Sequence, residues 1–255
     1  MRLEVKRSGQ STKTKIVLFL FSILAMTWAM GGFSLTNMLL AIFVLGMIFF
    51  HEWGHLKAAE YVHVGHKGMY FLPFLGGVAL INKIPRQRAR ECFIALAGPT
   101  LGMVFSLVLA ILSTVFNLPL LGTAAIICAL INLLNLLMPT NPLDGGRIIK
   151  SISFSIHPYV GKTVLVLANL LAIYLAMKGI FIMWLVALFG TIDMFEEFKI
   201  HRRRPKMQWF DIAYATAWTV IITALLFVSI IISKPMESSI IREAKEIVNE
   251  QKVHE

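Results

Sequence analysis

Charged residues are scarce in this 255-residue chain. They make up 15% of it, against about 25% in a typical soluble domain, while apolar residues make up 57% against about 45–50%. A soluble fold of this size has too little interior to hide so much apolar surface. The composition therefore excludes an ordinary soluble domain and predicts that lipid is the solvent for much of the chain.

Cysteine is nearly absent as well. Cys92 and Cys128 both lie in apolar runs, which indicates inert packing residues. The sequence also lacks an aromatic-rich basic stretch and a glycine-rich phosphate-binding loop. The net charge of +10 therefore indicates Lys and Arg in the cytoplasmic loops of a membrane protein, and we expect no nucleic-acid partner.

Seven apolar runs approach the length that a membrane-spanning helix needs, which is about 20 residues. A basic lead, residues 1–15, precedes the first run, and we interpret that run as a retained signal anchor rather than a cleaved signal peptide. The seven predicted spans cover approximately residues 16–33, 35–56, 92–116, 120–138, 160–177, 180–195 and 212–232.

Basic residues alternate between the connections of these spans. The connections after the second, fourth and sixth spans are rich in Lys and Arg, whereas the opposite connections hold only Lys178. This asymmetry predicts a multi-pass cell-membrane protein with its N-terminus in the cytoplasm. The charged tail, residues 234–255, then lies outside the cytoplasm, and its pattern allows a short amphipathic helix.

The second span ends in His51-Glu52-Trp53-Gly54-His55. Residues four apart share one face of a helix, so His51 and His55 can hold one metal ion together. Glu52 is then placed to act as a general base. Three ionisable residues at the end of an apolar helix are costly to insert, which favours a function over chance.

A catalytic zinc ion needs a third protein ligand. Asp144, in Asn141-Pro142-Leu143-Asp144-Gly145-Gly146-Arg147, follows the fourth span and therefore lies on the same side of the membrane as His55. Gly145 and Gly146 predict a tight turn that would aim Asp144 at the histidine pair. We expect His51, His55 and Asp144 to bind the metal.

The sequence resembles the site-2 protease family of intramembrane zinc metalloproteases. The resemblance rests on His51, Glu52 and His55, on the Asp144 motif, and on Ala97-Gly98-Pro99 in the third span. It implies one zinc ion per chain and hydrolysis of membrane-protein segments. It also implies an all-α polytopic fold with a six-span core over residues 16–200. A basic loop and an additional span, residues 201–233, follow this core.

The resemblance has departures. Only about thirty residues separate the second and third spans, too few for the PDZ domain of many members, and no CBS pair is present. In that connection, Gly76-Gly77 between apolar flanks predicts the turn of a β-hairpin. The family has a re-entrant hairpin here, whose edge strand can pair with an extended substrate. A buried connector is the alternative.

The implied partners are the lipid bilayer, a transmembrane or signal-peptide-like substrate, and an unidentified regulatory membrane protein. Asn132, Asn135 and Asn141 are candidates for holding the substrate backbone, together with Gly76 and Gly77. Two alternatives remain open: a metal-binding membrane protein without protease activity, and an inactive scaffold. A membrane zincin with a later Glu as third ligand is less favoured, because no suitable Glu-bearing helix follows the third span.

Overall fold

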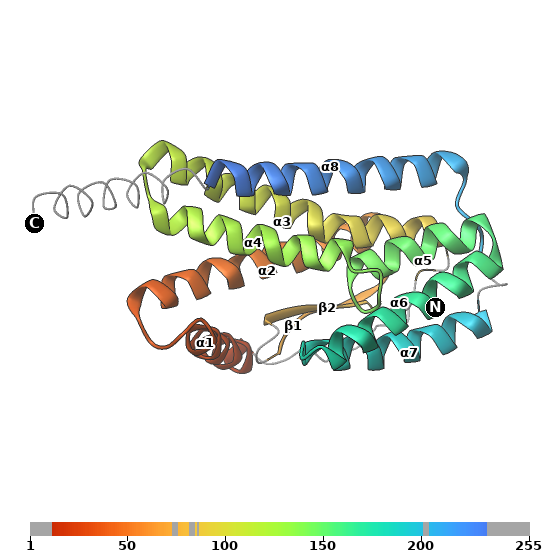
Figure 1. The fold of residues 1–255 in the computed structure, drawn as a ribbon, viewed down its shortest axis with the longest axis horizontal. Helices are drawn as coiled ribbons and strands as arrows, with labels where there is room; N and C mark the ends of the chain where they lie inside the picture. Colours follow the sequence, from red (N-terminus) through yellow and green to blue (C-terminus); the bar gives the residue numbers. More distant parts are fainter. Residues whose placement is uncertain (1–11, 73–75, 82–84, 86, 201–203, 234–255) are drawn as a thin grey trace, which may run out of the picture.

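The computed structural model describes residues 12–72, 76–81, 85, 87–200 and 204–233, so the N-terminal lead and the charged tail lie outside the described residues. Within these ranges the chain forms eight helices and two strands (Figure 1). In chain order these are α1 (Thr12–Ala29), α2 (Leu35–Tyr61), β1 (His66–Leu72), β2 (Gly76–Ile81), α3 (Arg88–Phe116), α4 (Pro119–Leu137), α5 (Asp144–Ile156), α6 (Pro158–Met177), α7 (Ile182–Ile200) and α8 (Trp209–Ser233).

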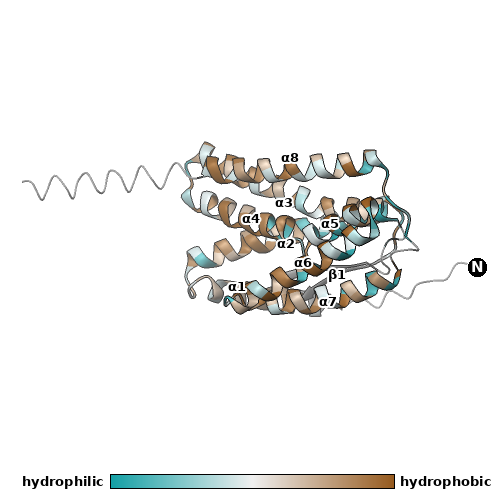
Figure 2. Ribbon diagram, turned by 45° about the vertical axis from the view of Figure 1, so that its right-hand side comes forward, coloured by the Kyte–Doolittle hydropathy of each residue, from teal (hydrophilic) through white to brown (hydrophobic). Residues whose placement is uncertain are grey.

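Five described helices are long and apolar enough to cross a membrane: α2, α3, α4, α6 and α8. The apolar stretch of α1, Ile16–Ala29, is shorter, and the C-terminal half of α7 carries four charged residues. Large apolar side chains are also exposed on most helices. Figure 2 shows hydrophobic residues along most of the helical ribbons. Such a surface is unfavourable in water and favourable in lipid, and it indicates a multi-pass membrane protein.

Helix α3 is the centre of the bundle, packed against α2, α4, α5 and α8 (Figure 1). Where α4 meets α2 and α3, small side chains are fully buried, among them Ala124, Ala125 and Cys128. Small residues let membrane helices approach closely, and close packing is what holds helices together in lipid. Both cysteines are buried and unpaired, which agrees with a packing role.

The connection between α2 and α3 contains the antiparallel pair β1–β2, which lies beside α2. The predicted position of the turn was wrong. Gly76 and Gly77 lie in β2, opposite Leu72 and Phe71, so residues 73–75 connect the strands and lie outside the described residues. Glycine is also found within strands, where another backbone approaches closely, so a Gly-Gly pair alone does not identify a turn.

The prediction of a tight turn at Asp144 was also wrong, because Asp144 begins the helix α5. The glycines serve close packing instead. A Cβ atom on Gly145 would lie 2.2 Å from the carbonyl oxygen of Leu136, and one on Gly146 would lie 2.3 Å from the carbonyl carbon of Thr140. Only residues without a side chain let the first turn of α5 sit against the end of α4.

Candidate metal centre

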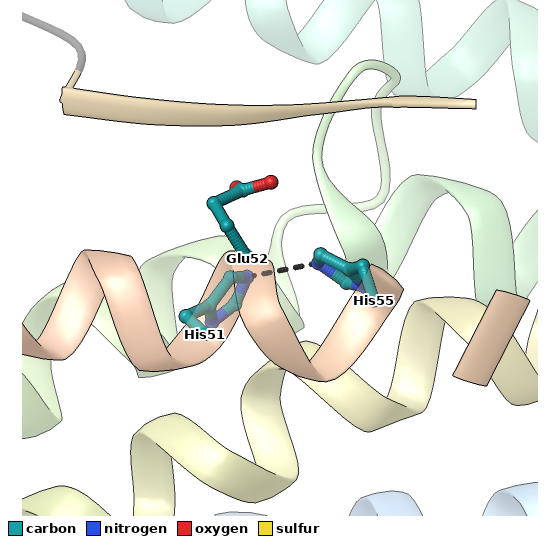
Figure 3. Close-up of side chains that lie close together, drawn as sticks. All are labelled: His51, Glu52 and His55. Atoms are coloured by element: carbon teal, nitrogen blue, oxygen red, sulfur yellow. Dashed lines mark hydrogen bonds between the residues drawn. The ribbon is translucent and has the colours of Figure 1, made fainter. Parts of the chain in front are cut away.

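His51 and His55 lie on one face of α2, one helical turn apart. Their Nε2 atoms are 3.1 Å from each other, and both side chains are buried within the bundle. Figure 3 shows the two imidazoles turned toward each other, while Glu52 points away from them toward a strand of the β1–β2 pair. The helical spacing thus brings the two nitrogens together as the sequence predicts.

The second nitrogen of each imidazole is engaged elsewhere. His51 Nδ1–H donates to Asn132 Oδ1 at 3.0 Å, and His55 Nδ1–H donates to the carbonyl oxygen of Ile94 at 2.8 Å. A hydrogen bond at Nδ1 fixes the tautomer and leaves the lone pair of a neutral imidazole on Nε2. The Nε2 lone pairs of His51 and His55 therefore point toward the same position.

Asp144 approaches from the first turn of α5. Its Oδ2 lies 3.0 Å from His51 Nε2 and 3.2 Å from His55 Nε2. Asn135 holds this carboxylate: its Nδ2 donates to Oδ2 at 2.7 Å, and its Oδ1 accepts from the Asp144 backbone N–H at 3.2 Å. Asn132 and Asn135 were predicted to hold the substrate, and in the structure their side chains are hydrogen-bonded to the proposed ligands His51 and Asp144.

Burial raises the pKa of Asp144, but a positive charge on His55 and hydrogen bonds from both histidines outweigh burial and lower that pKa below its usual range. A bound metal ion would take the place of the protons in these contacts. The carboxylate would then be ionised and both imidazoles neutral, which is the donor set of a zinc site.

These three atoms fit a single metal ion. With bonds of about 2.0–2.2 Å at tetrahedral angles, neighbouring ligand atoms of a zinc site lie about 3.3 Å apart. The separations here are 3.0, 3.1 and 3.2 Å. Glu52 also offers a carboxylate oxygen within 4.8 Å of the ligand nitrogens of both histidines. The arrangement therefore provides three converging donors with a further carboxylate beside them.

Helix α3 crosses α2 directly at the histidines. A Cβ atom on Gly98 would lie 2.3 Å from His55 Nε2 and 2.8 Å from His51 Nε2. The glycine of the Ala97-Gly98-Pro99 motif thus leaves room for the two nitrogens that face the proposed metal. This packing role could not be inferred from the motif alone, since it depends on where α3 crosses α2.

The remaining predicted site residues are less closely tied to this centre. Asn141 is buried, and its amide oxygen has no hydrogen-bond partner within the described part of the chain. Gly76 and Gly77 lie in β2, which runs beside α2. The sequence analysis missed the carbonyl of Ile94, because no side-chain signal marks a backbone acceptor.

Comparison with known proteins finds relatives of this chain. No protein-family model matches the chain. A curated protein of Methanocaldococcus jannaschii, named as a zinc metalloprotease, is 30% identical over 194 residues, which cover 74% of this chain and 53% of that protein. The chain therefore spans about half the length of this relative.

A solved structure, described as a site-2 protease from Methanocaldococcus jannaschii, superimposes with a TM-score of 0.50 at 29% identity. The match covers 71% of this chain and 88% of that one. These matches support membership in the site-2 protease family. The paired histidines on α2 and the Asp144 motif after α4 are the residues on which the resemblance was identified in the sequence.

Proposed function

We propose that this protein is an intramembrane zinc metalloprotease, in which His51, His55 and Asp144 hold one zinc ion and Glu52 is the general base. The convergence of three buried ligand atoms from α2 and α5, with each imidazole fixed through Nδ1, carries this proposal. A bound zinc ion supplies Lewis acidity, which lowers the pKa of a water molecule to about 7 and polarises the scissile carbonyl.

The protein's own groups move the protons. Glu52 accepts the proton that the attacking water loses and then donates it to the departing amine. Asn132 and the carbonyl of Ile94 keep the two imidazoles oriented. Asn135 keeps Oδ2 of Asp144 directed at the same proposed metal position as the two Nε2 atoms. These hydrogen bonds hold the site in place while the substrate changes.

The proposed substrate is a transmembrane or signal-peptide-like segment. A peptide bond within a helix is shielded by backbone hydrogen bonds, so the segment must unwind before hydrolysis, and the freed backbone groups need new partners in lipid. Strand β2, beside α2, is suited to pair with an extended segment. Gly76 and Gly77 belong to this strand, and the buried amide oxygen of Asn141 is a further acceptor.

We further infer seven membrane spans, with α1 and α7 added to the five apolar helices. The charges of α7 do not oppose this, because Asp193 and Glu197 are paired with basic side chains inside the protein. The N-terminus and the metal centre would then face the cytoplasm, since the connections on that side carry the basic residues. Cleavage would release a domain or peptide on that side.

The test is a trapping experiment with Glu52→Gln beside the wild-type protein in the source cell. The variant should bind one zinc ion per chain, because the three ligands remain, and should retain a membrane protein that mass spectrometry identifies. A soluble cytoplasmic fragment of that protein should form with the wild type alone. Full cleavage by Glu52→Gln, or the same zinc stoichiometry in His51→Ala, would refute the proposed centre. Zinc binding without any fragment would favour the metal-binding or scaffold alternative.

A cross-linking experiment addresses the role of the strand pair. A photo-reactive residue introduced at Val78 in the Glu52→Gln protein should cross-link to the trapped substrate. Cross-linking from Val220, a lipid-facing position on α8, serves as the control. Equal yields at the two positions would remove strand addition from the proposal.

A further inference from the structure

Six charged side chains gather beside α5, at the same end of the bundle as the metal centre. They come from α3, α5, α7 and the segment that leads into α8. We call this set the buried ion network; its members are Arg88, Glu91, Lys150, Asp193, Glu197 and Arg204. Arg88, Lys150 and Arg204 belong to the basic connections that the sequence analysis described, yet their side chains are buried in the structure.

Lys150 of α5 lies at the centre of the network. Its Nζ is 2.9 Å from Asp193 Oδ1 and 3.1 Å from Glu91 Oε1, and its side chain is only 1% exposed. Burial lowers the pKa of Lys150, but Glu91, Asp193 and Glu197 together raise it above the usual value. Lys150 is therefore a buried cation that contacts α3 and α7 at once.

The arginines complete the network. Arg204 Nη1 donates to Glu197 Oε2 at 2.9 Å, while its Nη2 pairs with Glu91 and donates to the carbonyl oxygen of Pro85 at 3.0 Å. Arg88 pairs with the other oxygen of Glu197. Three cations thus balance three anions.

Stability alone does not explain so many buried charges. The cost of removing ions from water is comparable to the attraction that they regain, so apolar residues of similar volume would hold these helices as well. Ion pairs add geometric specificity, because each pair fixes the positions of two helices relative to each other. Here the helices include the two that meet the histidines of α2.

Helices α3 and α5 both reach the proposed metal ligands. Glu91 lies one turn before Ile94, whose carbonyl accepts from His55, and Lys150 lies six residues after Asp144, about 9 Å along the same helix. The Glu91–Lys150 ion pair therefore joins the two helices close to the point where they hold His55 and supply Asp144.

We propose that Lys150 is a positioning residue of the metal centre: by tying α5 to α3 and α7, it keeps Asp144 within reach of the metal. This inference rests on the proposed function, in which Asp144 is a zinc ligand. Arg204 and Glu197 support the same arrangement from the segment before α8 and from α7.

The test compares Lys150→Met, the double variant Lys150→Met/Asp193→Asn and the control Lys206→Met, each purified in detergent beside the wild type. Lys206 is exposed and, among the described residues, its Nζ donates to the carbonyl oxygen of Ile156 at the end of α5. Zinc affinity is measured by competition with a chelator, ligand geometry by the visible absorption of the cobalt-substituted protein, and folding by thermal melting.

The single variant removes the basic partner of the partly buried Asp193, so we expect a lower melting temperature as well as weaker zinc binding. The double variant restores the charge balance, since Asp193 contacts no other member of the network. We expect it to melt near the wild-type temperature while binding zinc about tenfold more weakly, with a changed cobalt spectrum. Lys206→Met should match the wild type in all three measurements.

The outcomes separate the two proposals. If the folded double variant has the wild-type zinc affinity and cobalt spectrum, the positioning role of Lys150 is overturned and the proposed function stands. If the wild type itself binds no zinc, the proposed function fails and the positioning role fails with it. If Lys150→Met does not fold, the zinc affinity and cobalt spectrum of the double variant decide whether Lys150 has a positioning role.

Discussion

At the scale of single residues, the proposed metal centre depends on groups that never touch the metal. Gly98 is the most sensitive of them, because any side chain there would overlap the two Nε2 atoms. The contact is with the ends of two histidines that are themselves fixed through Nδ1, so neither ring is free to move aside.

We therefore expect Gly98→Ala to bind zinc at least tenfold more weakly than the wild type, measured as zinc per chain by elemental analysis and by chelator competition. Gly46→Ala is the matched control on α2, because an added Cβ atom there meets only the movable ring edge of Phe105 at 3.3 Å. Wild-type zinc affinity in a folded Gly98→Ala protein would contradict this account of the helix crossing.

Asn132 gives a second prediction at this scale. Its amide oxygen accepts from His51 Nδ1, and its amide nitrogen is held by the carbonyl of Cys128. Asn132→Leu keeps a similar volume but removes the acceptor, so zinc affinity should fall about 10–100-fold. Asn169→Leu is the control, because that side chain donates to Thr191. If the two variants bind zinc equally, Asn132 does not orient His51.

At the scale of the elements, α5 and α8 have different roles. Helix α5 delivers Asp144 and is fixed at both ends, by Asn135 at its start and by Ser155, whose hydroxyl accepts from the backbone N–H of Met207. Helix α8 packs against α3, where Trp218 Nε1 donates to Thr100 Oγ1 and the Ser229 hydroxyl donates to the carbonyl oxygen of Ser106. The additional span is thus part of the core that holds α3.

Two isoleucines of α8 test this supporting role. Ile222 is fully buried against the core, whereas Ile231 is 64% exposed and faces outward. Ile222→Ala should lower the free energy of unfolding by about 2 kcal/mol, the lower end for such buried substitutions, because in lipid the loss is of packing contacts rather than of hydration. Ile231→Ala should change it little, as measured by denaturation in mixed micelles. Equal losses would mean that α8 is not a core element.

At the scale of the whole molecule, the two sides of the membrane are distinguished by charge. The connection between α7 and α8 contains Lys206 and its basic neighbours, and the connection between α6 and α7 contains Lys178. If α6 and α7 both cross the bilayer, these two lysines lie on opposite sides.

Cysteine labelling measures this directly. Cys92 and Cys128 are at most 1% exposed and should not react, so single cysteines at Lys178 and Lys206 can be read without background. We expect a membrane-impermeant maleimide to label Lys178→Cys on intact cells and Lys206→Cys only after permeabilisation. Labelling of both from the same side would show that α7 does not cross, and the span count would then be six.

The sequence by itself determined most of the helices and the residues on which the proposed chemistry rests. The positions of His51, Glu52 and His55 follow from helical periodicity, and the apolar runs follow from the need to satisfy the backbone in lipid; both are local properties of the chain. The structure places helices over all seven predicted runs, with α1 and α3 each beginning four residues earlier than predicted.

Only the tertiary structure decided the rest. That Asp144 begins a helix, that Gly98 faces the histidines, and that Asn132 and Asn135 orient the proposed ligands all depend on which helices meet. The same holds for Lys150: as a residue type it indicates a solvated charge, and it is buried because α3 and α7 bring carboxylates to it. Periodicity and composition carry no information about contacts between residues distant in sequence, and those contacts turn three ligand candidates into one site.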